Sequence, residues 1–536
     1  MKKDFCAIGS LFIFCVLLLL VSTTKLFNFI QGQFLYVLVV LLACYVAMFD
    51  NWKRFIGRFI LLFIASYSCL YFGSILGFGF PIEDVFADVL SVALATNVNE
   101  VGTFFANFIA QKPIRLTCSL ICLIAFAIIF LLFNCRCSYL NIFNKRLSDL
   151  SVIALIFVFS IIVTSNRVVG SFSSFFDRLP AYISQVNQSI EAGKARQDFK
   201  WDAVASVKGR QTVVLILGET TRGDHMQVAG YPRETTPQLS KENLIVFKDA
   251  ISIGYHTLLS TPFMLTRKPV VKNNIYGLFG ETSIISAFKE AGFKTYYVSY
   301  LKPIVKGDNA INQIVAEADV YIQRPLAWGG AQDSLYLPIV KQLIENGKDE
   351  KKLIVVKLIG SHFNYQDMYP KEFDKFQPSF KTSTYIGPDP SKKDVFINTY
   401  DNSILHTDYV VSTIIGYLKT TKNEDVLLSF ISDHGTSIYE DGKTLYGGMK
   451  KANYNAAMFF WFGDKATKRL SKEISIMREN AEKPIDSTHF VDTILSLSGV
   501  ATPKKVGKDL LSDRLPSEDD RLVIFGTDIV PFKKIH

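Results

Sequence analysis

Cysteine is absent after residue 137 of this 536-residue chain. All eight cysteines precede that point, at positions 6, 15, 44, 69, 118, 122, 135 and 137. A carboxyl-terminal domain of residues 211–536 therefore cannot be stabilised by disulfides. A domain of that length is large enough to form a hydrophobic core, and its stability must come from that core.

Histidine shows the opposite distribution, because all seven histidines lie from His225 onward. Histidine is the commonest metal ligand among the side chains. Any metal site that uses an imidazole is therefore expected in the carboxyl-terminal part. The chain also shows no internal repeat and no low-complexity tract.

Long apolar runs are confined to the first third of the chain. The mean hydropathy of +0.23 is too high for one soluble domain. Five near-continuous apolar runs occupy residues 6–23, 29–49, 55–76, 116–133 and 150–164. Each is close to the roughly 20 residues that a helix needs to cross a bilayer, so residues 1–165 are predicted to form five transmembrane helices. Basic residues concentrate on alternate loops, which places the amino terminus in the cytoplasm and everything after Ser165 outside it.

Two further segments connect these predicted parts. Residues 78–112 carry apolar residues at helical spacing, which predicts one or two amphipathic helices at the outer membrane surface; a solvated loop helix is the alternative. Residues 166–210 combine Gly, Ser and Gln with alternating charge. We interpret them as a tether, in part an interfacial helix, that keeps the next domain near lipid headgroups.

Strands and helices are predicted to alternate through residues 211–536. Strands are expected at residues 212–217, 244–247, 294–299, 319–322, 352–358, 426–432, 456–462 and 521–525. Helices are expected at residues 256–265, 282–291, 333–345, 395–418 and 487–497. This order predicts one α/β domain with a mostly parallel sheet.

Polar side chains follow two of the predicted strands. Glu219 comes directly after the apolar run 213–217, and Asp433 and His434 follow a second such run. Functional sites in α/β sheets lie beyond the carboxyl ends of the strands. Carboxylates with an imidazole are ligands that zinc accepts, whereas capping of a following helix is the ordinary alternative for each residue. Two strands that deliver such residues to one sheet edge favour a metal site.

Two more residues have chemistry that suits such a site. Thr257 stands where a helix is expected to begin, so its hydroxyl can face the sheet edge. A threonine hydroxyl becomes a good nucleophile when a metal lowers its pKa, although helix capping is its commoner role. His362 follows the strand at 352–358 and could donate a proton to a leaving oxygen or hold a phosphate; a hydrogen-bonded loop histidine is the alternative.

Several motifs together resemble one enzyme family. They are GETTRGDHMQVAGYPRETTPQL from Gly218, the segment around Thr257, GSHFNYQDMYP from Gly360, YDNSILHTDYV from Tyr400, and SDHG from Ser432. In this order they resemble the phosphoethanolamine transferases of Gram-negative inner membranes, which modify lipid A or lipopolysaccharide core and are similar to the mobile colistin-resistance enzymes. The resemblance covers essentially the whole chain. It implies an alkaline phosphatase or sulfatase-like catalytic domain facing the periplasm.

The resemblance also implies a two-step transfer. Zinc held by residues matching Glu219, Thr257, Asp433 and His434 would activate Thr257. Thr257 would take phosphoethanolamine from phosphatidylethanolamine, release diacylglycerol, and pass the group to a lipid A or core sugar of lipopolysaccharide. One zinc ion is implied, and a second is left open. We expect a monomer, and neither the acceptor nor polymyxin resistance follows from the sequence.

Further residues match positions that contact substrate in this family. His362 matches a histidine that binds the substrate phosphate or acts as a general acid. Lys306 matches a donor-binding lysine, and Thr96 and Glu100 match the membrane-surface motif that contacts the donor headgroup.

The chain departs from the family pattern in several places. Lys357 stands where many members have a histidine, and Tyr446 or Gly448 stands where lipid A-type members have a second histidine. Ile253 and Phe263 stand where those members have bonded cysteines. Val92 also replaces a polar residue at the donor site. These differences leave the predicted nucleophile and its metal intact and favour a core-modifying or divergent branch.

Two other functions are compatible with parts of the sequence. The same fold and metal could transfer another headgroup, such as phosphoglycerol, or hydrolyse a phosphate or sulfate ester. A sulfatase proper would need a modified Cys or Ser, and Ser260 lacks the required spacing. A non-enzymatic lipid-binding protein would not need the four predicted metal-site residues. The net charge of +9 suits anionic lipid and lipopolysaccharide, and nucleic acid is not an expected partner of an exported domain.

Overall fold

The computed structural model describes residues 196, 198–272, 275, 279–300, 310–323, 332–381, 389–421, 423–503, 509–512, 515, 517, 520–526 and 528–536. All of them belong to one compact unit, Ile183–His536. The five predicted spans, the segment with Thr96 and Glu100, the tether up to residue 195, and Lys306 lie outside the described residues. Within the described ranges, no helix has both the length and the apolar character needed to span a bilayer.

A seven-stranded sheet in the order β3-β9-β8-β2-β7-β5-β6 forms the centre of this unit. Its strands are β2 (Gln211–Gly218), β3 (Ile245–Phe247), β5 (Lys294–Ser299), β6 (Val320–Gln323), β7 (Lys351–Lys357), β8 (Asp425–Ser432) and β9 (Met458–Phe462). Strands β8, β2, β7, β5 and β6 run parallel, whereas β9 is antiparallel to β8 and β3 is antiparallel to β9 at one edge. The prediction of an α/β domain with a mostly parallel sheet is confirmed.

Short strand pairs lie outside this sheet. They are β1 (Val204–Ala205) with β11 (Val500–Ala501), β4 (Ala250–Ile251) with β10 (Ile485–Asp486), and β12 (Leu522–Phe525) with β13 (Asp528–Pro531). The strand predicted at 521–525 is therefore present, but it forms a hairpin instead of extending the main sheet.

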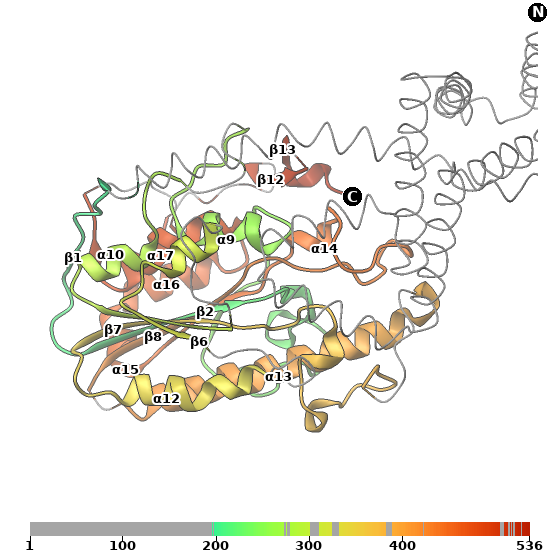
Figure 1. The fold of residues 1–536 in the computed structure, drawn as a ribbon, viewed down its shortest axis with the longest axis horizontal. Helices are drawn as coiled ribbons and strands as arrows, with labels where there is room; N and C mark the ends of the chain where they lie inside the picture. The colour runs from blue at the N-terminus through green and yellow to red at the C-terminus, as the bar shows by residue number, and fades with distance from the viewer. Residues whose placement is uncertain are drawn as a thin grey trace, which may run out of the picture. The chain divides into compact units, whose positions relative to one another are not determined.

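Helices cover both faces of the sheet. Their bounds are α9 (Thr257–Leu265), α10 (Ile284–Glu290), α11 (Ala310–Val315), α12 (Leu337–Glu345), α13 (Lys393–Lys419), α14 (Lys451–Tyr454), α15 (Asp464–Arg469), α16 (Ser471–Asn480) and α17 (Phe490–Leu497). Figure 1 shows α12 and α13 on one face and α9, α10, α16 and α17 on the other. The helices predicted at 333–345 and 487–497 each begin with a 3-10 turn, Asp333–Tyr336 and Ser487–His489.

The central strand β2 is apolar on both faces because each face packs against a different helical layer. Val213, Leu215 and Leu217 belong to the core beneath α10 and α17. Val214 and Ile216 belong to the core beneath α12 and α13. All five side chains are fully buried. For this reason, the sequence of a strand with helices on both sides is a continuous apolar run.

The register of the parallel strands brings three strand ends to one edge. Gly218 at the end of β2 pairs with Ser432 at the end of β8. Leu217 pairs with Lys357, the last residue of β7. The residues that follow β2, β8 and β7 are therefore neighbours in space although they are far apart in the sequence.

Candidate metal and nucleophile site

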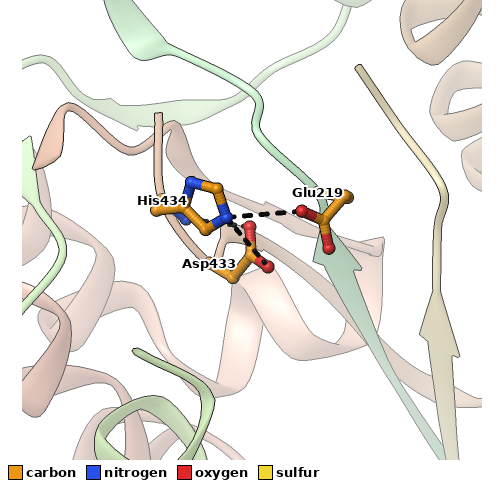
Figure 2. Close-up of side chains that lie close together, drawn as sticks. All are labelled: Glu219, Asp433 and His434. Atoms are coloured by element: carbon orange, nitrogen blue, oxygen red, sulfur yellow. Dashed lines mark hydrogen bonds and ion pairs between the residues drawn. The ribbon is translucent and has the colours of Figure 1, made fainter. Parts of the chain in front are cut away.

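Three predicted site residues meet at this edge of the sheet. Glu219 follows β2, and Asp433 and His434 follow β8. The His434 Nε2 atom lies 3.4 Å from Glu219 Oε1 and 3.9 Å from Asp433 Oδ2. Figure 2 shows the histidine ring nitrogen facing both carboxylates. All three residues are buried, and one ligand atom from each lies within 4.8 Å of the others.

Thr257 joins this group from helix α9. Its Oγ1 atom lies 3.1 Å from Glu219 Oε1, 3.2 Å from Glu219 Oε2 and 3.3 Å from His434 Nε2. Thr257 is the first residue of α9, whereas His256 occupies the N-cap position and makes no capping bond with its side chain. Helix capping, the ordinary alternative for Thr257, is therefore not its role here. The hydroxyl instead faces the sheet edge, as the sequence predicts.

The chemistry of these four residues fits a zinc ion. Two carboxylates, an imidazole and a hydroxyl are all ligands that zinc accepts. The Nδ1 atom of His434 lies 2.7 Å from the carbonyl oxygen of Gly435, which directs Nε2 toward the carboxylates. Asp433 Oδ1 accepts backbone N–H groups of Thr220 and His434, which leaves Oδ2 directed at the site. The side-chain orientations of His434 and Asp433 are therefore set by the surrounding backbone.

Lys357 is a further charged group at the strand ends, and the sequence pattern did not assign it to the site. Its Nζ atom donates hydrogen bonds to Gly218 O at 2.9 Å, Glu219 Oε2 at 2.8 Å and Asp433 Oδ2 at 3.2 Å. The sequence feature that could have indicated its role is its position at the end of an apolar strand, because a buried lysine needs a partner of opposite charge. In the sequence this lysine stands out only as the replacement of a family histidine.

The charges of the site perturb one another strongly. Burial alone would raise the pKa of Glu219, but the Lys357 ammonium and the His434 ring hold that pKa well below its usual range. Burial and the charge of Glu219 raise the pKa of Asp433. Burial lowers the pKa of His434, but the carboxylates of Asp433 and Glu219 outweigh it and raise this pKa to about 9. Zinc binding would displace the proton from that imidazole.

His362 lies in the loop after β7 and points toward a tyrosine. Its Nδ1 atom lies 2.6 Å from Phe363 O, and its Nε2 atom lies 3.3 Å from the hydroxyl of Tyr446. The Phe363 and Tyr446 rings stack with their centroids 5.0 Å apart. The charge of His362 contributes to lowering the pKa of Glu219, so this loop is electrostatically part of the site. Tyr446, rather than Gly448, contacts His362.

The loop with His362 is held by a buried carboxylate and a close backbone contact. Asp333 accepts the backbone N–H groups of Ile359 and Gly360, both at 2.8 Å. Gly360 has a φ of +56°, and a Cβ atom there would lie 2.5 Å from the carbonyl oxygen of Glu219. Only glycine allows this approach, so the loop after β7 and the strand end with Glu219 are packed directly together.

The YDNSILHTDYV motif forms part of α13 and supports the loop after β2. Tyr400 donates a hydrogen bond to Thr220 O at 2.7 Å and accepts one from the backbone N–H of Arg222 at 2.9 Å. Thr220 has a φ of +57°, a conformation that costs energy for a residue with a branched side chain. The tyrosine therefore helps to hold the strained residue next to Glu219.

Asp401, the next residue of the motif, holds three side chains of the same loop. Its carboxylate lies 2.7 Å from His225 Nδ1, and it accepts hydrogen bonds from Arg233 Nη1 at 2.7 Å and from the Tyr231 hydroxyl at 3.0 Å. The Asp401 side chain is fully buried. Both parts of this motif thus position the loop that carries Glu219, which is a structural role.

Replacement of Asp401 with alanine is expected to destabilise the protein, although Asp401 makes no contact with Glu219, Asp433, His434 or Thr257. The change leaves Arg233 and His225 without their buried partner, and such losses cost about 3–5 kcal/mol. Denaturant unfolding of the purified full-length protein would measure this. The matched control is Glu482→Ala, which breaks an exposed pair with Lys248 and should cost about 1 kcal/mol or less. Equal effects of the two changes would contradict the supporting role of Asp401.

Two departures from the family pattern meet in one apolar cluster. Ile253 and Phe263, which stand at the positions of bonded cysteines in lipid A-type members, are both buried. They share this cluster with Leu259, Ile275 and Ile524. Apolar packing therefore joins the segment before α9 to that helix. It holds in place the turn that presents Thr257.

Comparison with known proteins agrees with this arrangement. The model of the sulfatase family matches residues 211–500. Kdo(2)-lipid A phosphoethanolamine 7''-transferase of Escherichia coli is 29% identical over 302 residues, which are 54% of this chain and 52% of that protein. The chain spans between 52% and 61% of the length of this and two similar relatives. The resemblance to phosphoethanolamine transferases is confirmed.

Solved structures show the same fold. The zinc complex of the C-terminal periplasmic domain of EptC from Escherichia coli superposes with a TM-score of 0.54 at 22% identity, covering 62% of this chain and 96% of that one. The integral membrane lipooligosaccharide phosphoethanolamine transferase A from Neisseria meningitidis gives a TM-score of 0.50 at 18% identity. That match covers 87% of this chain and 96% of the other.

Proposed function

The chain belongs to the sulfatase family, and from this premise we propose that it transfers phosphoethanolamine from phosphatidylethanolamine to a lipopolysaccharide acceptor. The transfer uses Thr257 as nucleophile and Glu219, Asp433, His434 and Thr257 as zinc ligands. The observation that supports it best is the position of the Thr257 hydroxyl, 3.1 Å from Glu219 and 3.3 Å from His434. The name of the Escherichia coli relative supports the transferred group and the class of acceptor.

In the first step, Thr257 Oγ1 forms a bond to the phosphorus of the donor, and the bond from phosphorus to the diacylglycerol oxygen breaks. The hydrogen bonds from the hydroxyl to Glu219 fix the direction from which the oxygen attacks. A bound zinc ion would supply positive charge beside the Thr257 oxygen and the transferred phosphate. The threonine proton leaves to solvent, and the products are diacylglycerol and phosphoethanolamine on Thr257.

In the second step, an acceptor oxygen attacks the same phosphorus and the bond to Thr257 breaks. Any proton on the acceptor oxygen leaves to solvent, and the Thr257 oxygen takes one proton back from solvent, which restores the hydroxyl. His362 is the residue that would protonate the leaving oxygen of diacylglycerol in the first step. Its position beside the Glu219 end of the sheet and its contact with Tyr446 support this role.

Lys306, Thr96 and Glu100 are proposed to bind the donor.

The proposed location is the inner membrane, with residues 211–536 in the periplasm. Five apolar runs and the distribution of basic residues support it. The Neisseria meningitidis protein, described as an integral membrane protein, aligns over 87% of this chain. A catalytic domain tethered by residues 166–210 would meet both lipid substrates at the membrane surface.

Mass spectrometry of lipopolysaccharide tests the reaction directly. Cells that express the protein are expected to contain lipopolysaccharide heavier by one phosphoethanolamine unit than cells that lack it. Fragmentation would show whether lipid A or a core sugar carries the group. A phosphoglycerol increment would instead support transfer of another headgroup. Unchanged lipopolysaccharide together with release of free phosphoethanolamine would indicate a hydrolase.

A further inference from the structure

Lys357 is a buried cation whose hydrogen-bonding capacity is fully used. Its side chain is 4% exposed. An ammonium group has three donors, and here they reach Gly218 O, Glu219 Oε2 and Asp433 Oδ2. No donor remains for a substrate, so Lys357 does not bind the transferred phosphate directly. The bond to Gly218 O, a backbone atom of β2, anchors the ammonium independently of the two carboxylates.

Glu219 uses different oxygens for Lys357 and for His434, whereas Asp433 presents Oδ2 to both. Glu219 directs Oε2 to Lys357, whereas its Oε1 lies 3.4 Å from His434 Nε2. Thr257 lies within 3.2 Å of both Glu219 oxygens. Lys357 reaches the carboxylates from β7, whereas His434 follows β8 and Thr257 begins α9. The four proposed ligands would therefore hold one divalent ion with the ammonium beside it.

From this geometry we propose that Lys357 is a positioning residue that acts as a fixed positive charge beside a single metal ion. This inference rests on the proposed metal-dependent transfer. With a divalent ion, two carboxylates and the ammonium, the site carries a net charge of +1. That charge compensates the negative charge that develops on the Thr257 oxygen and the phosphate during transfer. The same charge repels the metal ion, so Lys357 weakens metal binding while it favours the reaction.

This proposal predicts that metal affinity and activity change in opposite directions. A residue that only supports the ligands would lower both when it is removed. Lys357→Gln keeps an N–H donor and removes the charge, and Lys357→Met removes both. Each variant is expected to bind zinc about tenfold more tightly than the natural protein, because a unit positive charge near a divalent ion is gone. Each is also expected to transfer phosphoethanolamine at least about a hundredfold more slowly.

Lys352 offers a matched control in the same strand. It is fully buried and donates three hydrogen bonds, to Leu343 O, Ile344 O and Asn346 O, at the opposite end of β7. Lys352→Met removes an equally buried ammonium far from the site. It is expected to lower the thermal unfolding temperature like Lys357→Met and to leave zinc affinity unchanged.

The experiment is a zinc competition titration of the purified full-length protein with a chelating dye, together with elemental analysis of zinc content. One zinc ion per natural chain and tighter binding by both Lys357 variants would support the proposal. Unchanged or weaker binding in Lys357→Gln would overturn it. The proposal would also be overturned if the natural protein bound no zinc and a Lys357 variant did bind it. The ammonium would then occupy the place of the metal. No substrate enters this titration, so its result stands apart from any failure of the proposed transfer.

Discussion

Thr257→Ala is expected to abolish transfer of phosphoethanolamine, with a loss of rate of about a thousandfold or more. The hydroxyl is the only group of this residue that faces Glu219 and His434, and alanine offers no oxygen to attack phosphorus. Zinc content should fall less than activity, because the three other proposed ligands remain. The measurement is labelling of lipopolysaccharide from a radioactive donor by the full-length protein in membranes.

Thr257→Ser is the control for this prediction. Serine keeps the attacking oxygen and loses one methyl group, so part of the activity should remain. A labelled protein band that is stable to acid should appear with the natural protein and with Thr257→Ser, and it should be missing with Thr257→Ala. If the alanine variant still transfers the group at a rate near that of the natural protein, Thr257 is not the nucleophile.

Asp433→Asn and Glu219→Gln are each expected to lower zinc affinity by at least about a hundredfold. Loss of a residue that only supports a metal ligand can already lower affinity by up to about a hundredfold, and loss of a ligand should cost at least as much. Each change removes one of the two negative charges that face His434 Nε2. It also leaves Lys357 next to the remaining carboxylate, which raises the electrostatic cost of placing a divalent ion there. Elemental analysis after dialysis against a weak chelator would measure the zinc that remains.

Asp333→Asn controls for burial of a carboxylate at the same edge of the sheet. Asp333 is buried and accepts two backbone N–H groups, but it does not belong to the group of potential metal ligands. Its variant should keep its zinc. Full zinc occupancy in both Asp433→Asn and Glu219→Gln would refute the ligand assignment, whereas loss of zinc in all three variants would indicate that the fold at this edge had been disturbed.

The main parts of the fold could be predicted because local patterns determine them. An apolar run that ends in a polar residue indicates a buried strand, and this placed Glu219, Asp433 and His434 at strand ends. Such a run does not indicate the direction of the strand. The antiparallel pairing of β9 with β8 therefore emerged only from the structure.

The contribution of Lys357 could not be predicted, because its contacts also depend on how strands pair. They require the register that places Leu217 beside Lys357, and one residue of slippage would turn its side chain to the other face of the sheet. Which of Tyr446 and Gly448 contacts His362 could not be predicted either, because the contact depends on a turn in which Tyr446 has a φ of +51°. By contrast, the motif around Thr257 already predicted that its hydroxyl can face the sheet edge, where it lies 3.1 Å from Glu219 Oε1.

The cluster formed by Ile253, Phe263 and their neighbours has a consequence for how the protein matures. Cysteines at these positions would require an oxidant and an isomerase to form the correct disulfide. Aliphatic and aromatic side chains pack spontaneously, because burying them removes apolar surface from water. The segment that presents Thr257 should consequently reach its final conformation at any ambient thiol potential. Treatment with dithiothreitol would then leave the conformation of residues 211–536 unchanged, because that part of the chain has no cysteine.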